Sequence, residues 1–185
     1  MNHFFKRYTV AFFVFFAPMM ATAGDTVLED FKSQPETRWG FFTDGVMGGV
    51  SLGQASFVAE NGDVHAHMTG NVSTENNGGF IQIRMELPDG APEDAKGVRL
   101  VVRGNNQEYF VHLRTSGTRL PWQYYQAGFD VSNDWKEVML PFTDFKPSGS
   151  FLRAVPRASS LKSIGVVAFG RDHEADVDIK EIGFY

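Results

Sequence analysis

Residues 79–87 read GFIQIRMEL, and this stretch decides the fold class. Its apolar side chains stand at every second position with polar ones between them: Ile81, Ile83, Met85 and Leu87 against Gln82, Arg84 and Glu86. Because successive side chains of a β-strand point to opposite faces, this alternation predicts a strand with one buried and one polar face. Residues 108–115, EYFVHLRT, repeat the pattern, with Tyr109, Val111 and Leu113 opposite Phe110, His112 and Arg114.

From Asp25 onward, further short runs of β-branched and aromatic residues alternate with Gly, Pro, Asn and Asp. We find no sustained i, i+3, i+4 apolar spacing of the kind that marks a helix. The sequence therefore predicts an all-β fold, and ten strands in one domain favour a two-layer β-sandwich. The expected strands are residues 26–31, 55–60, 64–72, 79–87, 97–104, 108–115, 123–129, 136–142, 163–170 and 177–185.

Two turns and one long connection join these strands. Asn61-Gly62 is typical of a tight β-hairpin, and Gly104-Asn105-Asn106 is interpreted as a second hairpin turn. Residues 146–160 have no clear period, so we expect a long loop with room for a short helical turn. Such loops are often functional, and they can equally be disordered.

The first 23 residues have the composition of a secretory signal peptide. Lys6 and Arg7 precede an apolar run, and Ala21-Thr22-Ala23 provides the small-residue cleavage site. Pro18 closes the apolar run before it reaches the length of a membrane span, so no stable membrane insertion is expected after cleavage. The sequence thus predicts a signal peptide at 1–23 and a single periplasmic or secreted domain at 24–185.

Charge and cysteine content narrow the class of partner. The chain has a net charge of −5, and cleavage would leave fifteen basic against twenty-two acidic residues, a net charge of −7. A negative domain gains no counterion release from nucleic acid, so nucleic acid is not expected as a partner. With no cysteine in the chain, the exported domain must rest on its hydrophobic core rather than on disulfides.

A glycine-rich stretch, TDGVMGGVSLG at residues 43–53, raises two catalytic hypotheses that its context rejects. The glycines do not have the spacing of a phosphate-binding loop, and no helix follows them. Gly49 to Gly53 matches G-x-S-x-G, but a nucleophilic serine needs a strand-to-helix turn, whereas a strand and a hairpin follow here. We therefore interpret the glycines as an irregular corner that Asp44 and Ser51 support through local hydrogen bonds.

Two clusters could ligate a metal or catalyse hydrolysis. His65 and His67 lie at i and i+2, the spacing of a shared metal, but two further ligands are not evident, so solvated histidines are favoured. Residues 174–181, EADVDIKE, place Glu174, Asp176 and Asp178 on one face. That face could serve a glycosidase or bind calcium, and an acidic outer surface is favoured over both.

Residues 120–129, LPWQYYQAGF, are rich in aromatics. If Tyr125, Ala127 and Phe129 face the core, then Trp122, Tyr124 and Gln126 face outward beside polar groups such as Arg114. Outward aromatics of this kind could stack on a sugar ring or contact a partner protein, and a buried aromatic cluster is an equal alternative.

Several of these pieces occur together in one order: Trp39 followed by TDGVMGGVS, then STENNGGFIQIRMEL, GVRLVVRGNNQEYFVHLRT, YYQAGF, WKEVMLPFTDF and a closing SIGVVAFG and VDIKEIGFY. In this order and spacing, the chain resembles the complex I intermediate-associated protein 30 family from about Val27 to Tyr185. The resemblance implies a galactose-binding-like jelly-roll sandwich. It also implies a non-catalytic role, since mitochondrial members look like assembly chaperones for the respiratory NADH dehydrogenase. An export signal departs from that role, because those members work on the matrix side.

The resulting expectation is a non-catalytic binding domain with a protein partner. A carbohydrate-binding module is the alternative, and a jelly-roll glycosidase is the third hypothesis. No catalytic residue, metal or cofactor is assigned, and a structural calcium ion is left open. The residues expected to bind are Trp39, Asp44, Met47, Ser51, Asn76, Asn77, Arg114, Trp122 and Tyr124.

Overall fold

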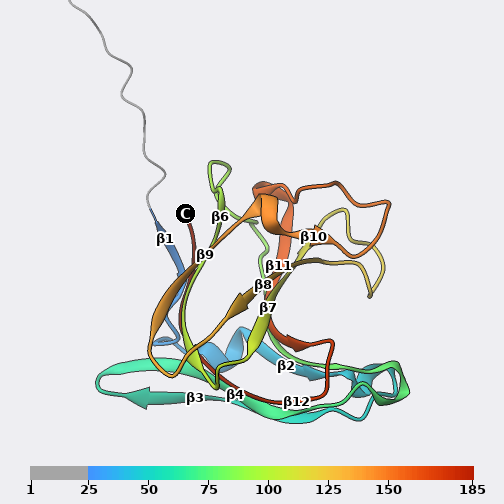
Figure 1. The fold of residues 1–185 in the computed structure, drawn as a ribbon. Coiled ribbons are helices and arrows are strands. Elements are labelled where there is room, and N and C mark those ends of the chain that lie inside the picture. The colour runs from blue at the N-terminus through green and yellow to red at the C-terminus, as the bar shows by residue number, and fades with distance from the viewer. Residues whose placement is uncertain (1–24) are drawn as a thin grey trace, which may run out of the picture.

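The computed structural model describes residues 25–185, so the predicted signal peptide lies outside the described residues. Within this range the chain forms two six-stranded sheets in which every pairing between neighbouring strands is antiparallel (Figure 1). The all-β prediction is confirmed. The strands are β1 (Thr26–Glu29), β2 (Trp39–Thr43), β3 (Leu52–Glu60), β4 (Asp63–Val72), β5 (Phe80–Glu86), β6 (Gly97–Gly104), β7 (Glu108–Thr115), β8 (Tyr125–Asp130), β9 (Lys136–Pro141), β10 (Lys146–Pro147), β11 (Leu161–Phe169) and β12 (His173–Phe184).

The helical elements of the described chain are single short turns. None of the described helices is long and apolar enough to cross a membrane. They are the 3₁₀ turns η1 (Pro35–Thr37), η2 (Asp44–Met47), η3 (Glu75–Asn77), η4 (Phe142–Asp144) and η5 (Ala158–Ser160).

The first sheet has the order β3-β4-β12-β6-β9, and β1 also pairs with β12. The hairpin of β3 and β4 extends along the bottom of Figure 1, and β1 lies beside the C-terminal end of the chain. The second sheet has the order β10-β8-β7-β11-β5-β2. Its four inner strands, β8, β7, β11 and β5, are therefore each held on both sides by neighbouring strands.

The core lies between the two sheets and is filled by the inward side chains of both. The alternation in β5 and β7 is confirmed, because the predicted inward residues of both strands are buried and their neighbours are partly exposed. The central strands β11 and β12 contribute fully buried apolar residues, among them Ile164, Val166, Val177 and Ile179. Burial of this apolar surface is the main stabilising contribution to the sandwich.

One predicted hairpin is confirmed and the other is wrong. Asn61 and Gly62 both have positive φ and join β3 to β4 as a two-residue turn between Glu60 and Asp63. The stretch Gly104 to Asn106 instead connects β6 in the first sheet to β7 in the second. Asn106 does adopt positive φ, so the turn chemistry is as expected, but the strands on either side do not pair with each other.

Two strands are not anticipated by the sequence pattern. β2 lacks a clear alternation because Gly40 interrupts it, yet it pairs with the edge of β5 over five residues. Within the stretch 146–160, predicted to be a long loop, Lys146 and Pro147 pair with β8 and residues 158–160 form the turn η5. β3 begins at Leu52, three residues before the predicted start.

Candidate functional site

The outer face of the second sheet presents polar side chains from its middle strands. One row across the sheet runs from Arg84 on β5 through Gly165 on β11 and His112 on β7 to Gln126 on β8. Because Gly165 has no side chain, this row has a low point between Arg84 and His112. The imidazole of His112 lies 2.8 Å from the side-chain oxygen of Gln126, which fixes its orientation on the sheet.

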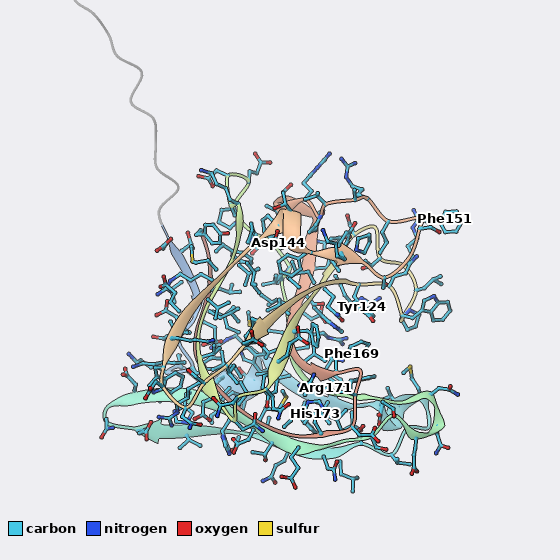
Figure 2. The ribbon with its side chains drawn as sticks, viewed as in Figure 1. Tyr124, Asp144, Phe151, Phe169, Arg171 and His173 are labelled. Carbon is cyan, nitrogen blue, oxygen red and sulfur yellow. The ribbon has the colours of Figure 1, made fainter. Side chains whose placement is uncertain are left out.

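Aromatic rings cover part of this row. The Tyr124 ring stacks on His112 with ring centroids 4.1 Å apart and an interplanar angle of 11°. Phe169 meets both rings edge-on, with its centroid 5.4 Å from that of His112 and 6.2 Å from that of Tyr124. Figure 2 shows Tyr124 and Phe169 next to each other, on the side of the molecule from which Phe151 projects. The cluster provides flat aromatic surface beside polar groups, which suits stacking against a sugar ring.

Two adjoining hollows lie along this face and share Arg84, Arg114 and Ser163. The smaller, about 50 Å³, is also lined by His112 and Tyr124. The larger, about 330 Å³, continues past them along the sheet. We call the two hollows together the sheet groove. Hollows of similar size lie elsewhere on the surface. The sheet groove brings the stacked rings of Tyr124 and His112 together with the side chains of Arg84 and Arg114.

Burial lowers the pKa of two ionisable groups of the groove, His112 and Arg114. It lowers the pKa of His112 to about 4, although the hydrogen bond with Gln126 acts in the opposite direction. The imidazole is therefore neutral at pH 7. The stacked Tyr124 ring shields the imidazole from water, although His112 as a whole residue is half-buried. Burial also lowers the pKa of Arg114, and the positive charge of Arg84 lowers it further. Arg114 nevertheless stays protonated, because a guanidinium group does not lose its proton in proteins.

The glycine-rich stretch forms a loop around the buried carboxylate of Asp44. One carboxylate oxygen accepts hydrogen bonds from the Ser51 hydroxyl at 2.5 Å and from the Gly79 and Phe80 amides at 2.5 and 3.3 Å. The other accepts from the Ser51 amide at 3.0 Å. Burial alone would raise the pKa of Asp44, but these hydrogen bonds outweigh it and the pKa is lowered. One side chain thus joins residues 44–51 to residues 79–80.

Two of the glycines are explained by this carboxylate. A β-carbon at Gly49 or at Gly78 would overlap the carboxylate of Asp44. Only glycine allows the backbone to approach so closely at these two positions. The interpretation of the stretch as a structural corner supported by Asp44 and Ser51 is confirmed.

Three of the predicted binding residues lie in the interior. Asp44 and Ser51 are buried in the loop just described, where the Ser51 hydroxyl donates a hydrogen bond to the Asp44 carboxylate. Trp39 is buried against the core and donates its indole N–H to Glu29 at 2.9 Å. Their burial and hydrogen bonds give these three side chains structural roles in the fold, and a binding role for them stays a prediction.

The other predicted residues divide into two groups. Met47 is 60% exposed near the end of η2, and Asn76 and Asn77 lie on the exposed turn η3, both with positive φ. Arg114 and Tyr124 line the sheet groove together. Trp122 belongs to the loop before β8 and is 65% exposed. A binding role for any of these residues stays a prediction.

The expected binding residues did not include Arg84 and His112, which line the groove, or Phe169, whose ring packs against His112 beside it. The alternation in residues 79–87 and 108–115 had placed Arg84 and His112 on polar faces. The pattern could not show which strands are neighbours in the sheet. β11 lies between β5 and β7, although it follows both in the chain by about fifty residues or more. Phe169 is apolar and ends a buried strand, so its outward position leaves no signal in the sequence.

The prediction for His65 and His67 is wrong in part. His65 is buried under the ring of Trp135, with the two ring centroids 5.6 Å apart. His67 lies 2.6 Å from a carboxylate oxygen of Asp178, whose other oxygen accepts from Arg103 at 2.7 Å. The outward face of Glu174, Asp176 and Asp178 is as predicted, but Asp178 is neutralised by its neighbours rather than free.

The structure also locates the residues of the metal and Ser51 hypotheses within residues 25–185. Within residues 25–185, no group of three or more His, Asp and Glu side chains is placed to hold a metal ion. The Ser51 hydroxyl donates to Asp44 and accepts from the Ser73 amide, so its described partners include no imidazole.

Solved structures with a similar fold include carbohydrate-binding modules and an agarase. A family 11 carbohydrate-binding module of the cellulosomal cellulase Lic26A-Cel5E of Clostridium thermocellum matches with a TM-score of 0.72 at 14% identity, over 89% of this chain and 95% of that one. The same family's module in complex with a β-1,3-1,4-mixed-linked tetrasaccharide gives 0.70 at 13% identity, over 89% and 96%. An exo-β-agarase gives 0.56 at 7% identity, over 88% of this chain and 25% of that one. The fold is therefore a jelly-roll sandwich of the galactose-binding-like class.

The family is shown by the sequence itself. Residues 29–179 match the family model of complex I intermediate-associated protein 30. The chain belongs to this family, as the order of its motifs indicated. No curated protein sequence matches the chain.

Proposed function

We propose that the chain is a non-catalytic binding domain that takes an oligosaccharide in the sheet groove. The observation that carries the proposal is the stacked pair of Tyr124 and His112 directly beside Arg84, Arg114 and Gln126. An aromatic plane supports the apolar face of a sugar ring, while planar polar side chains at its rim hydrogen-bond the hydroxyl groups. The fold shared with a tetrasaccharide-binding module supports this function.

Loss of the aromatic platform tests the proposal. Tyr124→Ala should weaken oligosaccharide binding by about 2 kcal/mol, or about 30-fold, because the stacking surface is removed. The measurement is isothermal titration with the oligosaccharide that binds most strongly on a glycan array. Phe151→Ala is the matched control, since Phe151 is an aromatic residue 96% exposed that lines neither part of the sheet groove.

Analysis of the oligosaccharide after the titration tests the absence of catalysis. After prolonged incubation the bound oligosaccharide should be recovered at its original length, as measured by mass spectrometry. A shortened product that disappears in Asp178→Asn would contradict the non-catalytic proposal. Equal affinities of Tyr124→Ala and the unchanged protein for every oligosaccharide would contradict the groove as the site.

Protein binding is the second candidate function, and exposed apolar residues on the loops favour it. Trp122 is 65% and Phe151 is 96% exposed, and both belong to loops that flank β8 and β10. Exposed aromatic residues are enriched where proteins bind one another. In this case Trp122→Ala and Phe151→Ala should release a co-purifying protein that Tyr124→Ala retains.

A further inference from the structure

The larger part of the sheet groove is lined by more basic than acidic side chains. Arg84, Arg114 and Lys162 line it, and Glu86 is the acidic residue of the lining. Glu86 lies 3.5 Å from Arg84 across an exposed ion pair, with a side chain that is 71% exposed. Such an exposed pair neutralises Arg84 weakly. The groove therefore keeps an excess of positive charge in a protein whose net charge is −5.

Arg114 differs from several arginines elsewhere in the molecule. Arg38, Arg99 and Arg103 each form ion pairs with carboxylates. Among the described residues, Arg114 has no carboxylate within ion-pair distance, and its guanidinium donates a hydrogen bond to the backbone carbonyl oxygen of Leu120 at 3.0 Å. Donors of its guanidinium thus remain available in the groove.

Burial and a like charge both act against the charge of Arg114. The pKa of its guanidinium is lowered first by burial and then by Arg84. Both effects disfavour the charged form, and an anion between the two guanidinium groups would relieve them. Guanidinium groups match carboxylate and sulfate oxygens with paired hydrogen bonds, which makes such an anion a specific ligand rather than a diffuse counterion.

Resting on the proposed function, we infer that the sheet groove selects acidic oligosaccharides: a ring stacks on Tyr124 while a carboxylate or sulfate of the sugar binds between Arg84 and Arg114. The two kinds of anion share this chemistry, and the choice between them is made by the ligand comparison below. Because the protein as a whole is negative, general attraction to any polyanion is not expected. The preference should therefore depend on these two arginines.

The experiment compares three forms of one oligosaccharide length by isothermal titration: an oligouronate, its carboxyl-reduced neutral form and a sulfated neutral form. One of the acidic forms should bind at least about tenfold more tightly than the neutral form, since charged hydrogen bonds are strong. The tighter acidic form identifies the anion. Polyglutamate, which has carboxylates but no sugar ring, should not compete.

Variants assign the preference to the arginines. Arg114→Gln and Arg84→Gln should each weaken acidic binding about tenfold more than they weaken neutral binding, because the lost charge serves the anion while the glutamine amide still donates to hydroxyl groups. Lys96→Gln is the control, because it removes one positive charge from the exposed loop before β6, outside the groove. If Arg114→Gln fails to fold by circular dichroism, the comparison of ligands on the unchanged protein still decides.

The outcomes separate this inference from the function on which it rests. Equal affinity for neutral and acidic forms, or an acidic preference that survives in both arginine variants, overturns the inference and leaves oligosaccharide binding intact. Absence of binding to all three forms and to a wider glycan array overturns both.

Discussion

At the scale of single residues, Asp44 shows how one buried carboxylate can organise a loop. Its two oxygens accept four hydrogen bonds, three of them from backbone amides. A buried donor left unpaired costs more than the average hydrogen bond contributes. The glycines at 49 and 78 are therefore consequences of this carboxylate, because each leaves the space that it occupies.

Removal of this carboxylate should destabilise the fold strongly. We expect Asp44→Ala to lower the free energy of unfolding by about 3 kcal/mol, and Asp44→Asn by less, because the amide oxygen still accepts some of the bonds. Urea denaturation followed by fluorescence measures the change. Asp144→Asn, an exposed aspartate that Figure 2 shows far from this loop, should change stability by less than about 0.5 kcal/mol. A loss for Asp44→Ala as small as that of the control would refute the structural role.

At the scale of elements, the sheet groove depends on contacts between neighbouring strands. His112 of β7 is held by Gln126 of β8 below the Tyr124 ring, so two strands and the preceding loop fix one imidazole. On β5, Ile83 fills the core while Gln82 and Arg84 face outward. The inner side chains pack in the core and fix the strands, and the outer side chains line the groove in which we propose that the ligand binds.

The buried imidazole should make stability fall in mild acid. The pKa of His112 is about 4 in the folded protein against an ordinary value of 6.5, so the unfolded chain takes up a proton first as the pH falls. The stability contributed by the neutral form is complete above pH 6.5 and is lost as the pH falls towards 4. The loss amounts to at most about 3 kcal/mol.

Urea denaturation at about pH 7 and about pH 4.5 measures this loss, and His112→Gln should remove it. His173, whose pKa is also lowered by burial, adds a loss in the same direction that both proteins share. The difference between the two proteins therefore isolates His112. Identical pH dependence in both would show that the imidazole does not remain neutral in the fold.

At the scale of the whole molecule, the two faces of the sandwich have different chemistry. On the outer face of the first sheet, Asp178 forms an ion pair with Arg103 and lies 2.6 Å from the His67 imidazole, and the ring of Trp135 lies 4.5 Å from the Arg103 guanidinium carbon. On the outer face of the second sheet, the charge of Arg114 has no carboxylate partner among the described residues. Binding is therefore expected on the second sheet.

Export is the prediction that concerns the whole chain. Expressed with its first 23 residues in a bacterial host, the protein should be recovered from the periplasm with Gly24 as its first residue, because the signal would be removed after Ala23. Intact-mass spectrometry of the periplasmic fraction measures the cleavage. Val14→Arg, which interrupts the apolar run, should leave the full-length chain in the cytoplasm. Equal amounts of cleaved protein from both would argue against the signal.

The sequence by itself determined the fold class, most of the strands and the family. Period-two alternation is a local property, so residues 79–87 and 108–115 reveal their inner and outer faces without knowledge of their neighbours. The hairpin at Asn61-Gly62 is equally local, because positive φ at both residues selects the turn. The order of the motifs indicated the complex I intermediate-associated protein 30 family, and the family model over residues 29–179 confirms it.

Only the tertiary structure decided which polar faces meet. The strand β11 lies between β5 and β7 because antiparallel sandwiches pair strands that are distant in the chain, and no local pattern encodes that choice. This strand order brings Arg84 and Arg114 into one groove and places Phe169 beside Tyr124. The tertiary structure also shows that Gly104 to Asn106 connects the two sheets rather than forming a hairpin. Burial likewise decided that Trp39, Asp44 and Ser51 support the fold from within, because the exposure of a side chain depends on everything that packs around it.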